Sequence, residues 1–132
     1  MMKIFVNGTF DVLHPGHVAL LNYARGLGSH LLVAIDTDRR VRELKGDSRP
    51  FFSQDERQLI LQNLRSVDAV RTFDSAEELE QIIKVYAPDI MVKGSDYRGR
   101  PIVGEHLVPR IEFFERIDEY SSTKAIQHLA DR

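Results

Sequence analysis

Short apolar runs alternate with longer segments of helical periodicity along most of this chain. Residues 4–6, 31–35, 69–73 and 89–92 are rich in aliphatic, β-branched and aromatic side chains, and polar or turn-forming residues bound each run, as is typical of buried strands. The run 31–35 is apolar at every position, which indicates a strand covered on both faces of a parallel sheet. Residues 111–117 have a similar composition and predict a fifth strand.

Helix start and stop signals separate these runs. Pro15 suits the first turn of a helix, and apolar residues follow it at helical spacing until two glycines break the pattern. Serines that can cap a helix N-terminus precede the three later helical segments. These predicted caps are Ser53, Ser75 and Ser121 or Ser122.

Two further interpretations rest on weaker patterns. Residues 39–50 begin with a short, strongly basic stretch and end in turn-forming residues, so we expect a mobile surface loop there. Helical and strand periodicity assigns several aliphatic residues to the core without any functional role. These are Leu59, Leu64, Ile82, Ile83, Ile90 and Val92.

The order of the predicted elements is typical of an α/β protein. Strands and helices alternate, which predicts a single Rossmann-like domain with a mainly parallel five-stranded sheet and helices on both faces. Such sheets bind ligands at the carboxyl ends of their strands, near the point where the strand order reverses. We therefore expect the loops that follow residues 6, 35, 92 and 117 to meet at one site.

Composition narrows the class of protein further. A chain of 132 residues is long enough for one domain with its own core and too short for two full domains, so we expect one domain over residues 1–132. The absence of cysteine excludes a disulfide framework, a thiolate metal site and a cysteine nucleophile. A net charge of -2 gives no overall basic field, so we expect no nucleic-acid partner. The longest apolar runs are strand-sized and the N-terminus lacks a signal-peptide layout, so we expect a cytoplasmic protein without membrane insertion.

The loops that we expect at the site share a phosphate-binding chemistry. Their glycines permit close backbone approach, helix N-termini present N–H groups, and lysine, arginine and imidazole add charge or donors. The turn after the first strand lacks the glycine spacing of dinucleotide-binding proteins and the Walker pattern. It carries His-x-Gly-His instead, and two imidazoles three residues apart lie on one helix face, where both can address one phosphate. A zinc pair at His14 and His17 is disfavoured because no third ligand is nearby, so we predict no metal ligands.

Two separated motifs resemble those of a known family. Residues 8–17, GTFDVLHPGH, resemble the first signature of the small nucleotidyltransferases of the cytidylyltransferase-like superfamily, and residues 121–124, SSTK, resemble the second. The two motifs together are more specific than His-x-Gly-His alone, which class I aminoacyl-tRNA synthetases also contain. The resemblance implies an enzyme that transfers a nucleoside monophosphate from a nucleoside triphosphate to a phosphorylated sugar or polyol and releases pyrophosphate. It further implies Mg²⁺ bound with the triphosphate, and a homodimer.

The resemblance also implies roles for individual residues. His14, His17, Lys45 and Arg116 are expected to stabilise charge on the phosphates during transfer. Asp11 either contacts the acceptor or orients its own loop. The residues expected to contact the nucleotide are Gly8, Thr9, Phe10, His14, Gly16, His17, Gly94, Asp96, Arg116, Ser121, Ser122 and Thr123. Those expected to contact the acceptor are Asp11, Lys45, Arg57 and Tyr97.

The identities of the nucleotide and the acceptor stay open at this level. Residues 45–50, KGDSRP, and 92–97, VKGSDY, resemble the adenylyltransferase part of the bacterial enzymes that make ADP-heptose from heptose 1-phosphate, which favours ATP. Two other features, Arg116 before the second signature and residues 97–100, YRGR, resemble instead the CTP-dependent glycerol-3-phosphate cytidylyltransferases. A non-catalytic nucleotide-binding module is a more remote alternative, because such a module could lose the histidines and this chain has both.

Overall fold

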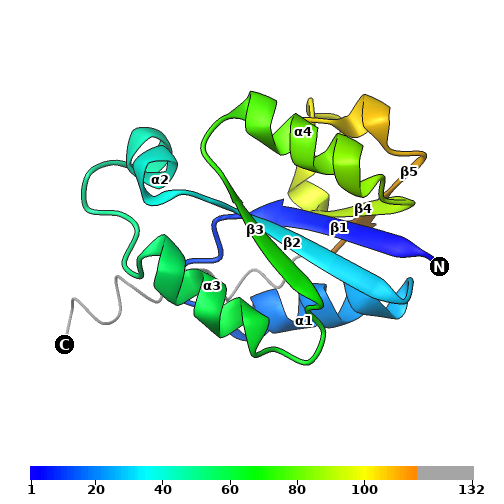
Figure 1. Cartoon of the computed structure of the whole chain (residues 1–132), viewed down its shortest axis with the longest axis horizontal. Coiled ribbons are helices and arrows are strands. Elements are labelled where there is room, and N and C mark those ends of the chain that lie inside the picture. Colours follow the sequence, from blue (N-terminus) through cyan, green and yellow to red (C-terminus); the bar gives the residue numbers. More distant parts are fainter. Residues whose placement is uncertain (116–132) are drawn as a thin grey trace.

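A five-stranded sheet forms the centre of the computed structural model, which describes residues 1–115 (Figure 1). All of the neighbouring strands are parallel, which confirms the predicted fold class. The strand order is β3-β2-β1-β4-β5, so it reverses between β1 and β4. The strands are β1 (Lys3–Gly8), β2 (His30–Asp36), β3 (Ala69–Phe73), β4 (Ile90–Gly94) and β5 (Arg110–Phe114).

Helices cover both faces of the sheet (Figure 1). Helices α1 (Pro15–Gly26) and α3 (Gln54–Gln62) lie on one face, and α4 (Ala76–Tyr86) lies on the other. Helix α2 (Asp38–Lys45) follows directly on the end of β2. Two short 3₁₀ helices, η1 (Ser95–Tyr97) and η2 (Glu105–Leu107), connect β4 to β5.

The core has two layers because side chains alternate along each strand. On β1, Ile4 and Val6 pack in one layer with Leu21 of α1. Phe5, which lies between them in sequence, packs in the other layer with Ile83 of α4. Since both faces of the central strands are covered, their side chains are apolar in both directions. This explains the continuous apolar run that the sequence has along β2.

The predicted serine caps of α3 and α4 are confirmed. Ser53 Oγ accepts the N–H of Glu56 at 3.2 Å, and the Glu56 carboxylate accepts the N–H of Ser53 at 2.9 Å, which is a capping box. Ser75 Oγ accepts the N–H of Glu78 at the start of α4. The expected cap at Ser121 or Ser122 lies outside the described residues.

Helix α2 lies where the sequence pattern indicated a mobile loop, so that prediction is wrong for residues 39–45. Thr37 caps the helix by accepting the N–H of Arg40. Val41 is the one buried residue of α2. A helix of eight residues that buries a single side chain has no apolar stripe, and periodicity therefore did not detect it.

The core assignment is also wrong for Leu59, which is 61% exposed. Helix α3 buries Arg57 and Leu61 instead. Since each helical residue turns by about 100°, Leu59 lies about 200° from Arg57 and on the opposite face. Ile83, Ile90 and Val92 are buried as expected, and Leu64 and Ile82 pack against the core.

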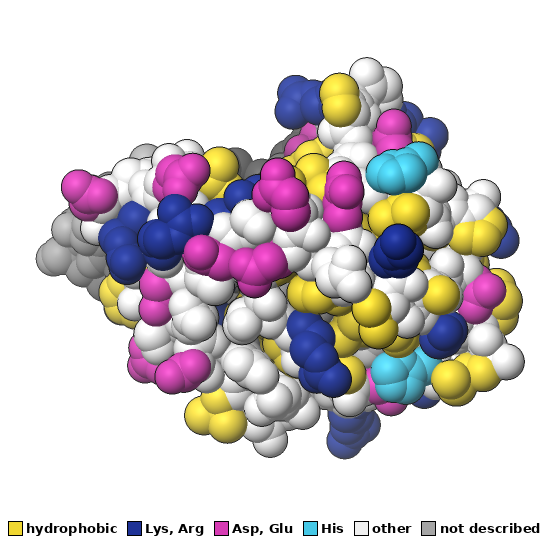
Figure 2. Space-filling model, turned by 45° about the horizontal axis from the view of Figure 1, so that its top comes forward, with side chains coloured by type: hydrophobic (Ala, Val, Ile, Leu, Met, Phe, Trp, Pro, Cys, Tyr) yellow, Lys and Arg dark blue, Asp and Glu magenta, His cyan; other side chains and the backbone are white. Residues whose placement is uncertain are grey.

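Charged side chains of both signs are interspersed on the face of the molecule that Figure 2 shows. Arg39 on α2, for example, forms ion pairs with Glu43 and with Asp74. Such mixing agrees with the nearly balanced charge of the chain.

Arg57 is fully buried and joins three segments that are distant in sequence. One terminal nitrogen of its guanidinium donates to the carbonyl oxygens of Thr9 and Asp36, both at 2.9 Å. The other terminal nitrogen donates to the carboxylate of Asp38 at 2.9 Å, and Nε donates to the carbonyl of Phe52 at 3.0 Å. The guanidinium therefore ties the loop after β1 to the end of β2 and to the start of α3.

Replacement of Arg57 by methionine should lower the free energy of unfolding by about 3 kcal/mol or more, because buried carbonyl groups then lose their donor. Arg65→Met is the matched control, since Arg65 lies exposed near the end of α3. Urea unfolding of both variants and the parent measures the difference. Equal stability of the two variants would contradict the structural role of Arg57.

Candidate active site

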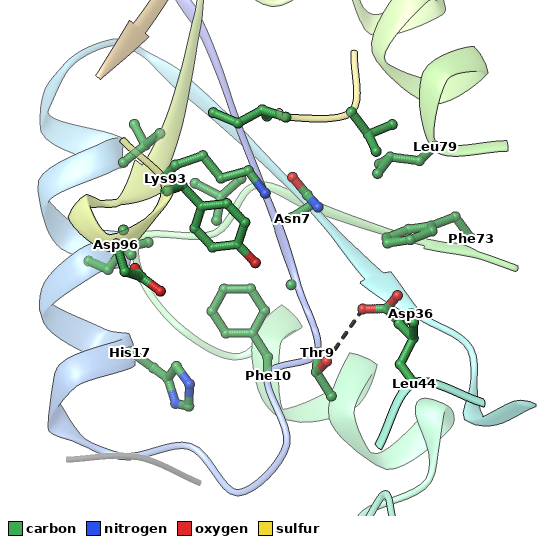
Figure 3. Close-up of a pocket in the computed structure, with 18 of the residues that line it drawn as sticks. Asn7, Thr9, Phe10, His17, Asp36, Leu44, Phe73, Leu79, Lys93 and Asp96 are labelled. Atoms are coloured by element: carbon green, nitrogen blue, oxygen red, sulfur yellow. Dashed lines mark hydrogen bonds between the residues drawn. The ribbon is translucent and has the colours of Figure 1, made fainter. Parts of the chain in front are cut away.

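A cavity of about 510 Å³ opens at the carboxyl ends of β1, β2 and β4 (Figure 3). This is the reversal point of the strand order, where the sequence predicts that the loops meet. Residues from β3, from the loop after β1, from α1, α2, α4 and η1, and from the segment after η1 complete the lining. The predicted site residues that line it are Gly8, Thr9, Phe10, Asp11, His17, Lys45, Gly94, Asp96 and Tyr97.

The other predicted site residues lie elsewhere. His14 and Gly16 are next to His17 at the start of α1, and Arg57 lies behind the cavity, where it holds the lining through Thr9 and Asp36. A set of four predicted residues lies outside the described part of the chain, and their roles stay predictions. These are Arg116, Ser121, Ser122 and Thr123.

The two histidines of the first signature form a capping box at the N-terminus of α1. His14 is the N-cap, and its Nδ1 accepts the N–H of Gly16 at 3.1 Å. His17 Nδ1 accepts the N–H of His14 at 3.2 Å, and the two rings stack with their centroids 3.8 Å apart. A neutral imidazole that accepts at Nδ1 carries its hydrogen at Nε2. Both rings therefore have an Nε2–H donor at the positive end of the helix dipole, which favours an anion.

The loop between β1 and α1 is held in a strained conformation. Phe10 and Val12 have φ angles of 51° and 49°, in the left-handed region, which costs about 1–3 kcal/mol for a residue other than glycine. Asp11 lies between them and is 1% exposed. Its carboxylate accepts the backbone N–H groups of Phe51 at 2.7 Å and Phe52 at 2.9 Å. These bonds favour the orienting role of Asp11 over direct contact with an acceptor.

Asp36 and α2 form another wall of the cavity. The Asp36 carboxylate accepts the Thr9 hydroxyl at 3.4 Å, the dashed line in Figure 3, and pairs with Arg40 at 2.8 Å. The negative charge of Asp36 is therefore balanced within the protein. Leu44 and Lys45, at the end of α2, extend this wall. Lys45 thus lies at the cavity in the last turn of a helix, whereas the sequence analysis predicts a loop there.

Lys93 is a candidate functional residue that the sequence analysis did not identify. It is 8% exposed on β4, and its amine points across the cavity toward Asn7 (Figure 3). The ammonium lies 4.6 Å from the centre of the Tyr97 ring and has no hydrogen bond or ion pair within residues 1–115. Burial lowers the pKa of the Lys93 amine from 10.5 to about 8, although Asp36 and Asp96 act in the opposite direction. The sequence does contain a signal for Lys93, because a lysine directly follows the apolar residues of β4.

Two negative findings apply to residues 1–115. No helix among them is both long and apolar enough to cross a membrane. No group of three histidine, aspartate or glutamate side chains in the same part of the chain is placed to hold a metal ion.

The fold and the cavity define a parallel α/β protein with a cavity at the reversal of the strand order, next to a helix capped by two imidazoles. The family model for cytidylyltransferase-like proteins matches residues 5–128, and the chain belongs to this family. The resemblance inferred from the two signatures is thereby confirmed.

Relatives named bifunctional protein HldE are similar to this chain over almost all of its length. The protein from Campylobacter concisus is 41% identical, over 97% of this chain and 27% of its own length. The protein from Koribacter versatilis is 43% identical, over 94% of this chain and 26% of its own length. The chain therefore spans about a quarter of the length of these relatives.

Two solved structures share the fold. A lipopolysaccharide core biosynthesis protein from Thermoplasma volcanium has a TM-score of 0.66 at 22% identity, over 87% of this chain and 99% of that one. Pantothenate synthetase from Thermus thermophilus has a TM-score of 0.61 at 14% identity, over 97% of this chain and 64% of that one. At such identities the similarity concerns the fold alone.

Replacement of Lys93 by methionine should stabilise the protein at pH 7 by about 2–3 kcal/mol, because the variant has no ammonium to desolvate. The unfolded chain keeps the lysine proton up to about pH 10.5, whereas the folded protein releases it near pH 8. The stability of the parent therefore rises with pH between these values, and the advantage of the variant shrinks. Urea unfolding of both proteins at pH 7 and pH 9.5 measures this.

Lys84→Met is the control for that experiment, because Lys84 is exposed on α4. Its effect on the free energy of unfolding should be small and the same at both pH values. A Lys93→Met variant that is no more stable than the parent at pH 7 would show that burial of the ammonium carries no cost.

Proposed function

We propose that this domain is a nucleotidyltransferase that transfers AMP from ATP to a sugar phosphate such as heptose 1-phosphate and releases pyrophosphate. The observation that carries the proposal is the stacked pair of His14 and His17, whose Nε2–H donors lie at the N-terminus of α1 beside the cavity. Membership of the cytidylyltransferase-like family supports it.

The proposed reaction needs no general base. The second pKa of a phosphate monoester is about 6, so the acceptor phosphate is already a dianion at neutral pH. One of its oxygens attacks the α-phosphorus of ATP and forms a new P–O bond, while the bond to the pyrophosphate oxygen breaks in line. No proton has to be removed from the acceptor, and no covalent enzyme intermediate forms.

Negative charge on the α-phosphoryl oxygens and on the leaving pyrophosphate is what the protein must stabilise. The Nε2–H groups of His14 and His17 are suited to the α-phosphoryl oxygens, and each well-placed donor of this kind contributes about 3 kcal/mol. Lys45 adds a positive charge from the end of α2. By the family resemblance, Arg116 would add charge, and the hydroxyl and N–H groups of residues 121–123 would bind the β- and γ-phosphates.

We assign the nucleotide-binding position to the end of β4 and to the loop after β1. Gly94 supports this assignment, because a Cβ at this position would lie 2.6 Å from Oδ1 of Asp96 and would displace that carboxylate. Gly8 likewise lies under the Phe10 ring, which a Cβ would approach to 3.0 Å. The two glycines therefore leave room for the side chains of Asp96 and Phe10 at the cavity, where these side chains can contact a ligand.

Mg²⁺ belongs to the proposal as a companion of the triphosphate. The carboxylates of Asp11 and Asp36 at the cavity already accept protein hydrogen bonds, so phosphate oxygens and water would supply most of the ligands of the ion, as Mg²⁺ prefers. The homodimer that the family resemblance implies and the cytoplasmic location that we expect from the sequence stay predictions.

ATP and heptose 1-phosphate are favoured by the resemblance of residues 45–50 and 92–97 to bacterial heptose adenylyltransferases. Residues from both segments line the cavity. The chain is also similar to the HldE proteins. The alternative is CTP with glycerol 3-phosphate, which the resemblance of Arg116 and of residues 97–100 supports.

Incubation of the protein with Mg²⁺, each of the four nucleoside triphosphates and either heptose 1-phosphate or glycerol 3-phosphate tests the proposal. We expect pyrophosphate from ATP with heptose 1-phosphate and much less from any other pair. Release from CTP with glycerol 3-phosphate alone would replace this assignment by the alternative. Nucleotide binding in a thermal-shift assay without any release would identify a non-catalytic binding module.

Replacement of His17 by alanine should lower kcat about 10²- to 10³-fold, because one donor to the transition state is lost. His17→Gln, which keeps an N–H at the end of the side chain, should retain part of the activity. The binding constant for ATP, measured by calorimetry, should change little.

His106→Ala is the control for this comparison, since His106 is exposed and lies outside the cavity lining. The melting temperature of each variant has to be measured as well, because His17 also accepts a hydrogen bond from the N-cap. Full activity of a folded His17→Ala variant would refute the assigned role.

A further inference from the structure

The cavity reaches both faces of the sheet. His17 and Leu20 line it from α1, which packs on one face. Asn7, Asp36 and Lys93 each lie two residues beyond a strand residue of the core layer that packs on α4. Because side chains alternate along a strand, these three side chains extend that layer to the open edge of the sheet.

We call this part of the cavity the α4-side compartment. Its floor is polar, and its walls are apolar. In Figure 3, Phe73 and Leu79 lie on the opposite side of Asn7 from Lys93, and His17 lies well away from them. The residues that define the compartment are Asn7, Asp36, Phe73, Leu79, Lys93 and Ile102.

Two polar groups on this floor lack partners among the described residues. Lys93 is 8% exposed as a residue, and its ammonium has neither a hydrogen bond nor an ion pair within residues 1–115. Oδ1 of Asn7 is buried and accepts no hydrogen bond. Buried polar groups in folded proteins are almost always paired, so each unpaired group needs an explanation. Here one group offers donors and a positive charge, and the other offers an acceptor.

The charges in the compartment favour an anionic ligand that also carries hydroxyl groups. Asp36 is already paired with Arg40 and bonded to Thr9, and it offsets only part of the cost of burying the Lys93 charge. A phosphate or hydroxyl oxygen of the ligand can accept from Lys93, and a ligand hydroxyl can donate to Asn7. The apolar walls of Phe73 and Leu79 suit the C–H face of a sugar.

We propose that Lys93 and Asn7 bind the phosphorylated sugar acceptor in the α4-side compartment and determine acceptor specificity. The inference rests on the proposed function, which assigns the histidine side of the cavity and the end of β4 at Gly94 and Asp96 to the nucleotide. Lys93 contributes charge and donors to the acceptor oxygens, and Asn7 accepts from a hydroxyl of the acceptor.

The test is steady-state kinetics of Lys93→Met and Asn7→Leu with ATP and heptose 1-phosphate. Loss of a charge-assisted hydrogen bond should raise the KM for heptose 1-phosphate about 10- to 100-fold in Lys93→Met. Asn7→Leu should raise it about 3- to 10-fold, as expected for a neutral bond. The KM for ATP should stay within about twofold in both variants, a separation that general damage to the fold would not produce.

Lys84→Met is again the control, because this exposed lysine of α4 lies outside the cavity lining. It should leave both KM values unchanged. A rise in the KM for ATP with an unchanged KM for heptose 1-phosphate would place Lys93 in the nucleotide site and overturn the inference. Unchanged KM values for both substrates in Lys93→Met would overturn it as well.

Calorimetry separates failure of this inference from failure of the proposed function. If the parent protein releases no pyrophosphate, heptose 1-phosphate and glycerol 3-phosphate are titrated into the parent and into Lys93→Met. Binding to the parent that is weakened at least tenfold in the variant supports the acceptor site even without turnover. Equal binding to both proteins, or no binding of either sugar phosphate to the parent, overturns it.

Discussion

The buried guanidinium of Arg57 holds the site together. Its planar fork has donors in fixed directions, and it bonds carbonyl groups from the loop after β1, the end of β2 and the segment before α3. The Asp11 carboxylate adds a second connection between the first and the last of these segments. Together they hold the left-handed Phe10 and Val12 in place, and the chain then enters α1 with His14 at the helix N-terminus.

The histidine motif has two physical roles that depend on each other. A serine or aspartate would cap α1 equally well, but its short side chain would end at the backbone N–H groups. An imidazole that accepts the cap hydrogen bond at Nδ1, as both rings do here, has its N–H donor at Nε2, on the far side of the ring. The hydrogen bonds that complete the helix therefore also select the tautomer and the direction of the two donors. The residues that cap α1 are therefore the same ones that we propose to bind phosphate.

The cavity contains a lysine, Lys93, whose burial is unfavourable and which could bind a ligand. Lys93 is desolvated and has no ion pair within residues 1–115, and its lowered pKa means that the buried charge lowers the stability of the folded protein. Features of this kind occur at binding sites, where a ligand supplies the missing partner. The sheet edge divides the cavity, with the imidazoles on the side of α1 and Lys93 with Asn7 on the side of α4.

The sequence by itself determined the parallel α/β fold, the serine caps of α3 and α4, and the family. These depend on local signals: the period of apolar residues, a cap three residues from its partner, and motifs of ten and four residues. Tertiary structure alone decided that Leu59 faces solvent, that α2 is a helix, and that Lys93 and Arg57 are buried. The Asp11 carboxylate accepts hydrogen bonds from two residues that are 40 and 41 positions further along the sequence. Arg57 donates a hydrogen bond to Thr9, which precedes it by 48 positions. Burial and pairing of a polar side chain depend on which distant segments fold against it, and no local pattern contains that information.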